Sequence, residues 1–418
     1  MHKDYFDIYP TAQLQGRIQL PASKSISNRA LLINALCADG ITPDNLSDCD
    51  DTQVMLRALH DMPDTIDIGA AGTAMRFLTA YLCVTPGSHT ITGSERMRHR
   101  PIGILVEALR CLGAKIEYLG EEGFPPLRIT GNPELKGGEV SVSGSVSSQF
   151  ISALLMIGPV LKQGLSLRLT GKVVSRPYLD MTVTIMRQFG AQVEWESDNE
   201  VRVSPVRYKS RPYSIENDWS AASYWYEMVA LSRDPKAEVV LPGLHAESMQ
   251  GDSQVSTIFS ELGVVTEYLL EDDGTEAVRL RKGNNLTCSL SCDLSSQPDL
   301  AQTIIVTAAM LDIPFTIGGL RTLRIKETDR IAALCRELGN LGLSIEDKGN
   351  DRMEWSGVWE RRVELPEIAT YEDHRMAMAF APACLRMGGI RIMNPAVVSK
   401  SYPSYWEHLK NIGFKICS

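Results

Sequence analysis

Hydrophobic and polar positions along the chain recur in one order: an amphipathic helix, a glycine and a short alternating strand. Apolar residues fall three to four positions apart in this pattern, as Leu334 and Leu338 do, which is the spacing of a buried helix face. The strands that follow, such as "AKIEY" and "AQVEW", alternate as half-buried strands do. The pattern is strong in four segments, which start at Arg100, Arg176, Asp252 and Glu327. It is weaker in two further segments, which start at Asp50 and Tyr402.

Glycines stand where these helices should end. A helix favours a left-handed residue just after its last turn, and glycine adopts that conformation most easily. The glycines expected in this role are Gly113, Gly190, Gly263 and Gly339.

The strong copies start about 75 residues apart, which indicates a repeated structural unit of about two helices and several strands. Six such units, three in each half, would fill the 418 residues. Chance repetition of a common α/β pattern is the alternative, and six occurrences make it the weaker one. The stretch "SPVRYKSRPYSIEND" breaks the pattern, so we expect a domain boundary near Ser214.

Composition narrows the class of protein. The apolar fraction of 44% and charged fraction of 22% are typical of a globular protein, and the length exceeds one ordinary core. A net charge of −9 argues against a protein that coats nucleic acid or an anionic membrane. Nine cysteines stand singly without a C-x-x-C pair, and no apolar run approaches a membrane span or a signal core. We therefore expect a soluble cytoplasmic protein without a disulfide framework.

Polar and cationic residues stand just before several of the expected helices. Lys24, Ser25 and Arg29 lie in "PASKSISNRALLINAL", and Thr73 lies in "GAAGTAMRFL". Free N–H groups and the helix dipole make such helix starts suitable for anions. An ordinary capped helix start with surface cations is the alternative for each.

Two further helix starts are rich in donors. The loop "GSERMRHRPIG" is crowded with cations, and an anionic partner explains it better than solvent because Arg binds carboxylates and phosphates in pairs of hydrogen bonds. Its basic residues are Arg96, Arg98, His99 and Arg100. The motif "SSQF" precedes an apolar run, which favours a donor-rich cap over a flexible linker.

The motif "KETDR" places Lys326 and Arg330 four residues apart, so on a helix they would share a face, where like charges repel. Either they form the solvated first turn of a surface helix, or both point at an anionic ligand. Glu327 within the motif, and Asp299 before another apolar helix, are acids able to move protons. Capping the helix is the alternative role of Asp299. Further candidates near helix starts are His374, Arg375 and Lys400.

Taken together, these helix starts predict a cleft. If the helices of each half run parallel, two halves that face each other would line it with cations, hydroxyls and helix N-termini. Such a cleft should bind one or two small ligands with several negative charges, and Asp299 and Glu327 could move protons there.

The motifs "KSISNRALL", "AGTAMR", "RPIG", "SSQF", "KETDR", "DHRMAMAF" and K-S-Y-P resemble the 5-enolpyruvylshikimate-3-phosphate synthase family in order and spacing over essentially the whole chain. The resemblance implies the two-domain enolpyruvyl transferase fold of the α/β class. In it each domain holds three βαβαββ units with parallel helices, as an inside-out α/β barrel. It also implies a first domain at 22–214 that mainly binds shikimate 3-phosphate. A second domain, at 1–21 and 215–418, would complete the phosphoenolpyruvate site, with the active site in the interdomain cleft.

The resemblance further implies a transferase of the shikimate pathway, which makes aromatic amino acids. It would move the enolpyruvyl group of phosphoenolpyruvate to the 5-hydroxyl of shikimate 3-phosphate through a tetrahedral intermediate and release phosphate. We expect a monomer that uses no metal or cofactor and binds neither nucleic acid nor membrane. The implied catalytic residues are Lys24, Asp299 as base and Glu327 as proton donor.

The same resemblance assigns the contacts to each substrate. Those to shikimate 3-phosphate are Lys24, Ser25, Arg29, Thr73, Ser147, Ser148, Gln149, Ser175, Tyr178, Asp299, Thr322 and Lys326. Those to phosphoenolpyruvate are Lys24, Gly72, Arg100, Gln149, Arg330, His374, Arg375 and Lys400.

The chain departs from the family pattern at Ala70, Phe77 and Thr322, where Asn, Pro and Asn are usual. The first two departures leave sensitivity to glyphosate open. The related UDP-N-acetylglucosamine enolpyruvyl transferases are one alternative, but they carry a reactive Cys in the loop aligned with "SERMRHRPIG". Here the next cysteine is Cys111, expected to pack in the core. The second alternative is a non-catalytic anion-binding or RNA-end-binding protein, which would leave Asp299 and Glu327 without a role.

Overall fold

The computed structural model describes residues 4–145, 147–349, 351–359 and 365–418. The chain divides into two compact units. Unit 1 consists of Met1–Pro21 and Glu216–Ser418, and unit 2 of Ala22–Ile215. Each is described by itself. Within the part of the chain that the structure describes, no helix combines enough length and apolarity to cross a membrane.

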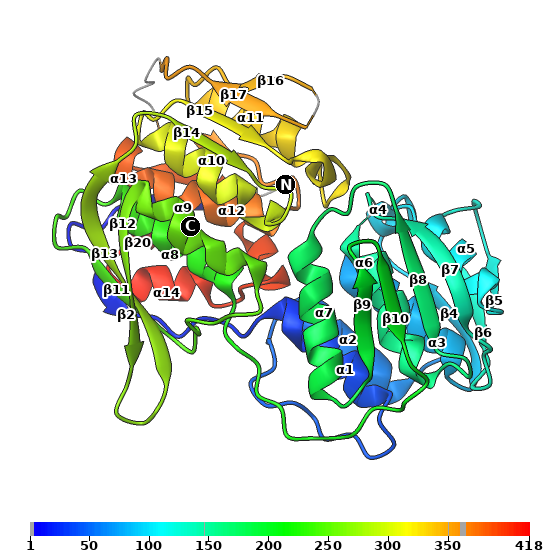
Figure 1. Cartoon of the computed structure of the whole chain (residues 1–418). Coiled ribbons are helices and arrows are strands. Elements are labelled where there is room, and N and C mark those ends of the chain that lie inside the picture. Colours follow the sequence, from blue (N-terminus) through cyan, green and yellow to red (C-terminus); the bar gives the residue numbers. More distant parts are fainter. Residues whose placement is uncertain (1–3, 146, 350, 360–364) are drawn as a thin grey trace. The chain divides into compact units, whose positions relative to one another are not determined.

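Unit 2 contains two four-stranded sheets built in the same chain order, βαβαββ (Figure 1). In each sheet the first two strands run parallel and the other neighbours antiparallel, in the order first, second, fourth, third. The first copy comprises β3 (Thr65–Asp67), α3 (Gly72–Val84), β4 (Gly87–Thr92), α4 (Glu95–Arg98), α5 (Gly103–Cys111), β5 (Lys115–Tyr118) and β6 (Leu127–Gly131). The second comprises β7 (Gly138–Ser143), α6 (Ser148–Ile157), η1 (Gly158–Val160), β8 (Leu165–Thr170), α7 (Arg176–Gln188), β9 (Val193–Ser197) and β10 (Glu200–Val203).

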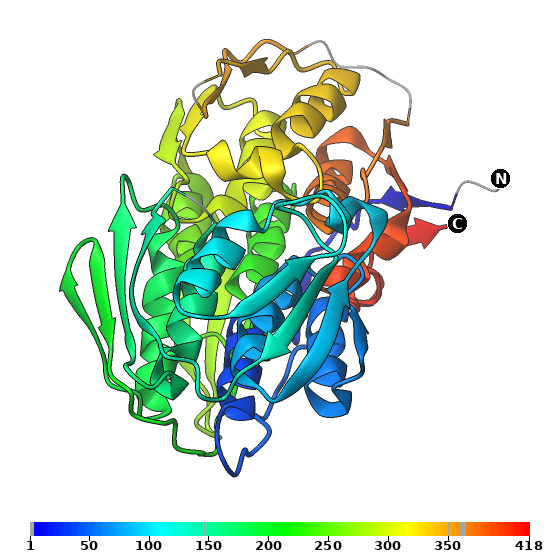
Figure 2. The ribbon, with the colours of Figure 1, turned by 90° about the vertical axis from the view of Figure 1, so that its right-hand side faces the viewer.

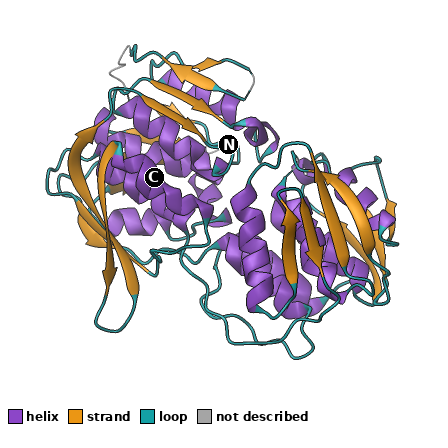
Figure 3. Cartoon of the chain, viewed as in Figure 1, coloured by secondary structure: helices purple, strands orange, loops and turns teal. Residues whose placement is uncertain are grey.

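The third copy of unit 2 is reduced. It has the helices α1 (Lys24–Ala35) and α2 (Asp50–Asp61), and an isolated parallel bridge joins Asp44 to Ser214. The helices α1, α3 and α6 contact one another and are the most buried of the unit, while α2, α5 and α7 pack against them. The sheets therefore cover a bundle of helices, as Figure 3 shows.

Unit 1 contains three four-stranded sheets with the same strand order. The first copy comprises β2 (Gln15–Arg17), α8 (Trp219–Leu231), β11 (Glu238–Pro242), η2 (Gly251–Gln254), α9 (Val255–Ser260), β12 (Leu262–Leu270) and β13 (Glu276–Leu286). The second comprises β14 (Leu290–Asp293), η3 (Pro298–Leu300), α10 (Ala301–Met310), β15 (Phe315–Gly318), η4 (Arg321–Ile325), α11 (Arg330–Asn340), β16 (Glu346–Asp347) and β17 (Met353–Trp355).

The third copy of unit 1 closes with the other end of the chain. It comprises β18 (Glu367–Ile368), α12 (His374–Phe380), η5 (Ala381–Ala383), α13 (Cys384–Met387), β19 (Ile390–Met393), η6 (Pro395–Lys400), α14 (Tyr405–Asn411) and β20 (Lys415–Cys417). Its fourth strand is β1 (Tyr5–Tyr9), which pairs antiparallel with both β19 and β20. In Figure 2 the blue N-terminal strand lies beside the red C-terminal one.

The centre of unit 1 is a bundle of three wholly buried helices. Every residue of α8, α10 and α12 is buried, and the three contact one another. A helix that is apolar on all sides needs protein on all sides, which explains why the sheets lie outside.

The glycine predictions are partly correct. Gly113 (φ +101°) and Gly190 (φ +85°) adopt the left-handed conformation after α5 and α7, as expected. Gly263 has φ +81° but lies in β12. Gly339 lies inside the last turn of α11, and the left-handed residue there is Gly342 (φ +95°). The helix ends one turn later than expected because Gly339 keeps a helical backbone.

Candidate active site

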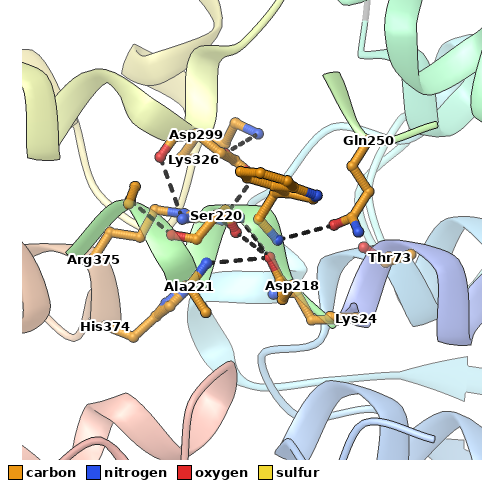
Figure 4. A network of polar contacts seen from close by, with 12 residues as sticks. Lys24, Thr73, Asp218, Ser220, Ala221, Gln250, Asp299, Lys326, His374 and Arg375 are labelled. Atoms are coloured by element: carbon orange, nitrogen blue, oxygen red, sulfur yellow. Dashed lines mark hydrogen bonds and ion pairs between the residues drawn. The ribbon is translucent and has the colours of Figure 1, made fainter. Parts of the chain in front are cut away.

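The N-termini of the three buried helices of unit 1 meet (Figure 4). Asp218 caps α8, and its Oδ1 accepts hydrogen bonds from the Ser220 (2.8 Å) and Ala221 (3.2 Å) backbone N–H groups. Arg375, the second residue of α12, donates from Nη2 to Ser220 Oγ (3.3 Å) and to Asp299 Oδ2 (2.8 Å). Asp299 lies in η3, two residues before α10 begins, so a single guanidinium links all three helix starts.

Asp299 is not the N-cap residue of its helix. The N-cap positions are Gln297 for η3 and Leu300 for α10, and neither makes a side-chain capping hydrogen bond. The Asp299 carboxylate lies near cations: besides Arg375, Arg330 Nη1 is 3.5 Å and Lys326 Nζ is 3.7 Å from Oδ1. The capping interpretation is therefore wrong, and Asp299 belongs to a charged cluster.

Arg330 lies at the centre of this cluster and is almost fully buried. Its Nε and Nη2 donate to the two carboxylate oxygens of Asp373 (2.7 and 3.3 Å), and Nη2 also donates to Glu327 Oε2 (2.9 Å). Lys400 Nζ donates to the other oxygen of Glu327 (2.9 Å). Burial lowers the pKa of Arg330, but Asp373, Glu327 and Asp299 together outweigh burial and raise it. The guanidinium is therefore permanently charged.

The "KETDR" motif does not lie on one helix, which corrects the expectation from sequence. Helix α11 begins only at Arg330, and Asp329 is its N-cap, accepting from the Ile331 and Ala332 N–H groups (both 3.1 Å). Lys326 has an extended backbone after η4. Lys326 and Arg330 nevertheless converge, because both reach Oδ1 of Asp299. Burial lowers the pKa of Lys326, while the Asp299 charge opposes that shift.

The cluster has four basic side chains and three acidic ones, so the basic side chains outnumber the acidic ones by one. The basic ones are Lys326, Arg330, Arg375 and Lys400, and the acidic ones are Asp299, Glu327 and Asp373. His374 is buried with Nδ1 3.7 Å from Asp373. Thr322 lies in η4 with its hydroxyl buried. The Tyr224 hydroxyl accepts from Arg375 (3.3 Å), and burial raises its pKa to about 12.

Arg29 is the most buried predicted site cation of unit 2. Its Nε donates to Thr182 Oγ1 (2.7 Å) and its Nη2 to Ser152 Oγ (3.2 Å). The backbone carbonyls of Ser25 (2.9 Å) and Tyr178 (3.3 Å) accept from Nη1 and Nη2. All four acceptors are neutral oxygens, and burial lowers the pKa of Arg29 to about 10. These dipoles hold the cation without neutralising it.

A second buried cation of unit 2 stands beside a glycine. A Cβ at Gly72, the first residue of α3, would lie 2.7 Å from Arg100 Nη1, so a larger residue there would displace this guanidinium from its position. The Arg100 Nε is buried without a partner among the described residues. The other basic residues of that loop, Arg96, Arg98 and His99, are exposed. Of the predicted cationic loop, therefore, only Arg100 points into the protein.

The remaining predicted residues of unit 2 lie at the starts of α1, α3, α6 and α7. Lys24 begins α1, with Nζ 3.5 Å from Asp51 Oδ2. Gln149 Nε2 donates to Thr73 Oγ1 (3.0 Å), which joins α6 to α3. Ser147 caps α6, as "SSQF" predicted, and Ser148 is its first residue. Ser175 precedes α7 in a left-handed conformation (φ +55°), and Tyr178 lies in its first turn.

Two positions outside the predicted contacts differ from what the sequence indicated. Phe77 is fully buried in α3, and the Arg29 guanidinium lies 5.4 Å from the centre of its ring. The residue that departs from the family pattern here therefore packs against a predicted site cation. Cys111 ends α5 and is exposed, so the expectation of core packing is wrong.

Several structural partners of the site were not predicted from the sequence. They are Asp51, Ser152, Thr182, Tyr224 and Asp373. Asp373 alone could have been found, because an acid directly before "HRMAMAF" is a typical N-cap. It does cap α12, with Oδ1 accepting from the Arg375 N–H group (2.9 Å). The others lie on distant helices and are brought close only by packing.

Comparison with known proteins identifies the family. The family model described as EPSP synthase (3-phosphoshikimate 1-carboxyvinyltransferase) matches residues 8–66 and 61–409. The chain belongs to the EPSP synthase family. A relative from Bacteroides fragilis, named 3-phosphoshikimate 1-carboxyvinyltransferase, is 56% identical over 406 residues, 97% of both chains. A relative of the same name from Pectobacterium atrosepticum is 37% identical, over 97% of this chain and 98% of that protein.

The fold is shared with solved structures of this family. The EPSP synthase from Acinetobacter baumannii superposes with a TM-score of 0.79, covering 99% of this chain and 100% of that one at 23% sequence identity. The enolpyruvyl transferase fold expected from the sequence is therefore confirmed.

Proposed function

We propose that the chain transfers the enolpyruvyl group of phosphoenolpyruvate to the 5-hydroxyl of shikimate 3-phosphate and releases phosphate. Membership of the EPSP synthase family supports this reaction. The observation that carries it at the level of chemistry is the cluster in unit 1. There, two carboxylates able to move protons, Asp299 and Glu327, are surrounded by four cations. Binding of anions alone would not need these acids.

The cations of the cluster are the proposed contacts for the phosphate and carboxylate of phosphoenolpyruvate. Arg330, Arg375 and Lys400 now donate to Glu327 and Asp299. An arriving phosphate competes for the same N–H groups, because charge-assisted hydrogen bonds to it are strong. Glu327 then loses the cations that favour its charged form and can hold the proton that the reaction needs.

Arg29, Lys24 and the serines at the starts of α1, α6 and α7 are the proposed contacts for shikimate 3-phosphate. Neutral oxygens already orient the Arg29 guanidinium, so binding a phosphate there displaces no carboxylate. Gly72, Arg100 and Gln149 are proposed to serve phosphoenolpyruvate from this unit.

The chemistry follows from these groups. Asp299 takes the proton of the 5-hydroxyl, whose oxygen bonds to the central carbon of phosphoenolpyruvate, while Glu327 gives a proton to the methylene carbon. The resulting tetrahedral intermediate has a methyl group, a carboxylate and a phosphate on one carbon. The ionised Glu327 then takes a proton back from the methyl group while the C–O bond to phosphate breaks, and Asp299 returns its proton to the leaving phosphate. The double bond is restored, and the enolpyruvyl ether is the product. Lys24 is proposed to balance charge that develops during addition.

The test is release of phosphate from phosphoenolpyruvate with shikimate 3-phosphate, and separately with UDP-N-acetylglucosamine. We expect release only with shikimate 3-phosphate, and its loss in Asp299→Ala and Lys24→Met. Release only with the sugar nucleotide would overturn the proposal in favour of the related transferase. Binding of both anions without any release would favour a non-catalytic protein.

Two further expectations belong to this proposal: a cytoplasmic location and a monomeric state. A biosynthetic enzyme that acts on small phosphorylated metabolites works where they are made. Sedimentation of the purified chain tests the second, and a stable dimer would contradict it.

A further inference from the structure

The turn before α12 holds two consecutive residues in a conformation that side chains rarely adopt. Tyr371 has φ +53° and Glu372 has φ +56°. Left-handed backbone at a residue other than glycine is strained and persists only where its surroundings hold it. The next residue is Asp373, the partner of Arg330. The strained turn therefore determines where this carboxylate lies.

Glu337 on α11 holds the turn at two points. Its Oε1 accepts a hydrogen bond from the Tyr371 hydroxyl, and its Oε2 accepts one from the Ala369 N–H group (3.2 Å). The Glu337 side chain is buried, although its carboxylate contacts no substrate-binding cation of the cluster. The guanidinium of Arg336 lies 5.7 Å from the centre of the Tyr371 ring. These contacts account for the persistence of the strained backbone.

The same helix carries both Glu337 and Arg330. They are seven residues apart, about two turns, and so lie on one face of α11. That face is fastened to segment 369–373 at both ends: Glu337 binds Ala369 and Tyr371, while Arg330 binds Asp373. A shift of the turn would move Asp373 relative to Arg330.

We propose that Glu337 is a positioning residue of the transferase, which acts through Tyr371 and Asp373 to aim Arg330. This inference rests on the proposed function and deepens it. With the turn held, Asp373 occupies the Nε edge of Arg330 and leaves Nη1 and part of Nη2 directed at Asp299 and Glu327, where the phosphate of phosphoenolpyruvate would bind. With the turn released, that edge loses its fixed partner.

The experiment compares steady-state kinetics of Glu337→Gln and Tyr371→Phe with the wild type, varying each substrate in turn. We expect the KM for phosphoenolpyruvate to rise roughly tenfold to hundredfold, because a displacement of about 1 Å can have such an effect. The KM for shikimate 3-phosphate should change less than twofold. Tyr268→Phe is the matched control: it removes a tyrosine hydroxyl of the same unit, which bonds Ser256 (3.5 Å) far from the turn in sequence, and should change neither KM.

A rescue variant separates positioning from a general structural role. Glycine adopts the left-handed backbone without strain, so Glu372→Gly in the Tyr371→Phe background should recover part of the lost affinity for phosphoenolpyruvate. Equal effects on both KM values, or no rescue, would overturn the inference. An unchanged KM in both single variants would do so as well.

Binding of inorganic phosphate, measured by calorimetry, keeps the inference separate from the function. Weaker phosphate binding by Glu337→Gln than by the wild type supports the positioning role. It does so even if the wild type releases no phosphate from phosphoenolpyruvate, because that failure would refute only the proposed function. Equal phosphate binding in both proteins overturns the positioning role.

Discussion

The two units hold their buried cations in different ways. In unit 1, Arg330, Arg375 and Lys400 are bound to carboxylates. In unit 2, the most buried site cation, Arg29, is bound to hydroxyl and carbonyl oxygens, whereas the less buried Lys24 lies 3.5 Å from the Asp51 carboxylate. Predicted site residues lie at or just before the N-termini of the inner helices α1, α3 and α6 of unit 2 and α10 and α12 of unit 1, so the difference lies in the partners and not in the architecture.

This difference separates two tasks. A cation bound to carboxylates must exchange them for the ligand, and that exchange changes how tightly the carboxylates hold protons. A cation bound to neutral dipoles offers its charge to an anion without such an exchange. Unit 1 is therefore suited to proton transfer, and unit 2 to holding a phosphate in a fixed place.

The largest expected effect is on the acids of unit 1. Glu327→Gln and Asp299→Asn should each lower kcat roughly 10²- to 10⁴-fold, the range in which general acids and bases contribute. Asp329→Asn, in the same motif, removes a carboxylate but keeps a good N-cap, and should retain nearly full activity. Phosphate release measures all three. Equal losses in all three would show that general disturbance of the segment, and not proton transfer, explains the effect.

The second effect concerns the neutral cage of unit 2. Arg29→Met should raise the KM for shikimate 3-phosphate roughly tenfold to hundredfold, the value of one or two hydrogen bonds to a charged group, and leave kcat closer to the wild type than the acid variants do. Arg187→Met, which removes a cation of α7 that donates to a backbone carbonyl (2.9 Å), is the control. The comparison between units breaks down if Arg29→Met lowers kcat as far as Glu327→Gln.

A third prediction contrasts two buried carboxyls of unit 1. Asp373 is paired with Arg330, whereas the carboxylate oxygens of Glu227 in α8 are buried without a hydrogen-bond partner among the described residues, and this burial raises the pKa of Glu227 well above its usual value. A raised pKa means that the folded state holds the proton more tightly. The contribution to stability is complete below the unfolded pKa near 4.5 and is lost as pH rises toward the folded value.

Urea unfolding at pH 5 and pH 8.5 checks this contrast. Between the two pKa values, Glu227 is protonated in the folded state and ionised in the unfolded state. In that pH range the free energy of unfolding of the wild type should fall by about 1.4 kcal/mol per pH unit. Glu227→Gln should remove most of that slope. Glu407→Gln, an exposed acid of α14 in the same unit, should keep it. A wild type and Glu227→Gln with identical slopes would show that Glu227 does not titrate as stated.

The smallest effect concerns the strained turn. Glu372→Asn should raise the free energy of unfolding by about 0.5–1 kcal/mol, because Asn adopts the left-handed backbone more readily than Glu. Thermal unfolding of unit 1 should show a melting temperature higher by about 1–2 °C. A lower melting temperature would mean that the Glu372 side chain stabilises the turn in a way that the strain argument omits.

Local patterns predicted much of the fold. Apolar spacing identified α5, α7 and α11, and Gly113 and Gly190 ended the first two as expected. The pairing of β1 with β19 and β20 could not be read from the sequence, because strands so far apart carry no local signal of their partner. The prediction that Gly339 ends α11 was wrong because the backbone conformation of this residue depends on the packing of the helix.

The candidate site was predictable as a set of residues but not as a set of contacts. The motifs named Asp299, Glu327 and Arg330, yet the shared helix face of "KETDR" was wrong, since Asp329 starts the helix only at Arg330. The partners that hold the cations lie on other helices. The contrast between charged and neutral partners therefore appears only in three dimensions.

The most direct test of this division is the reaction run in deuterium oxide. Protonation of phosphoenolpyruvate at its methylene carbon, followed by loss of a methyl proton, should place deuterium in the enolpyruvyl group of the product. We predict that the wild type incorporates deuterium into the product. At saturating shikimate 3-phosphate, Arg29→Met should incorporate it at nearly the same rate. Glu327→Gln should incorporate it at least about a hundredfold more slowly. Equal slowing in Arg29→Met and Glu327→Gln would contradict the division of proton transfer and anion binding between the two units.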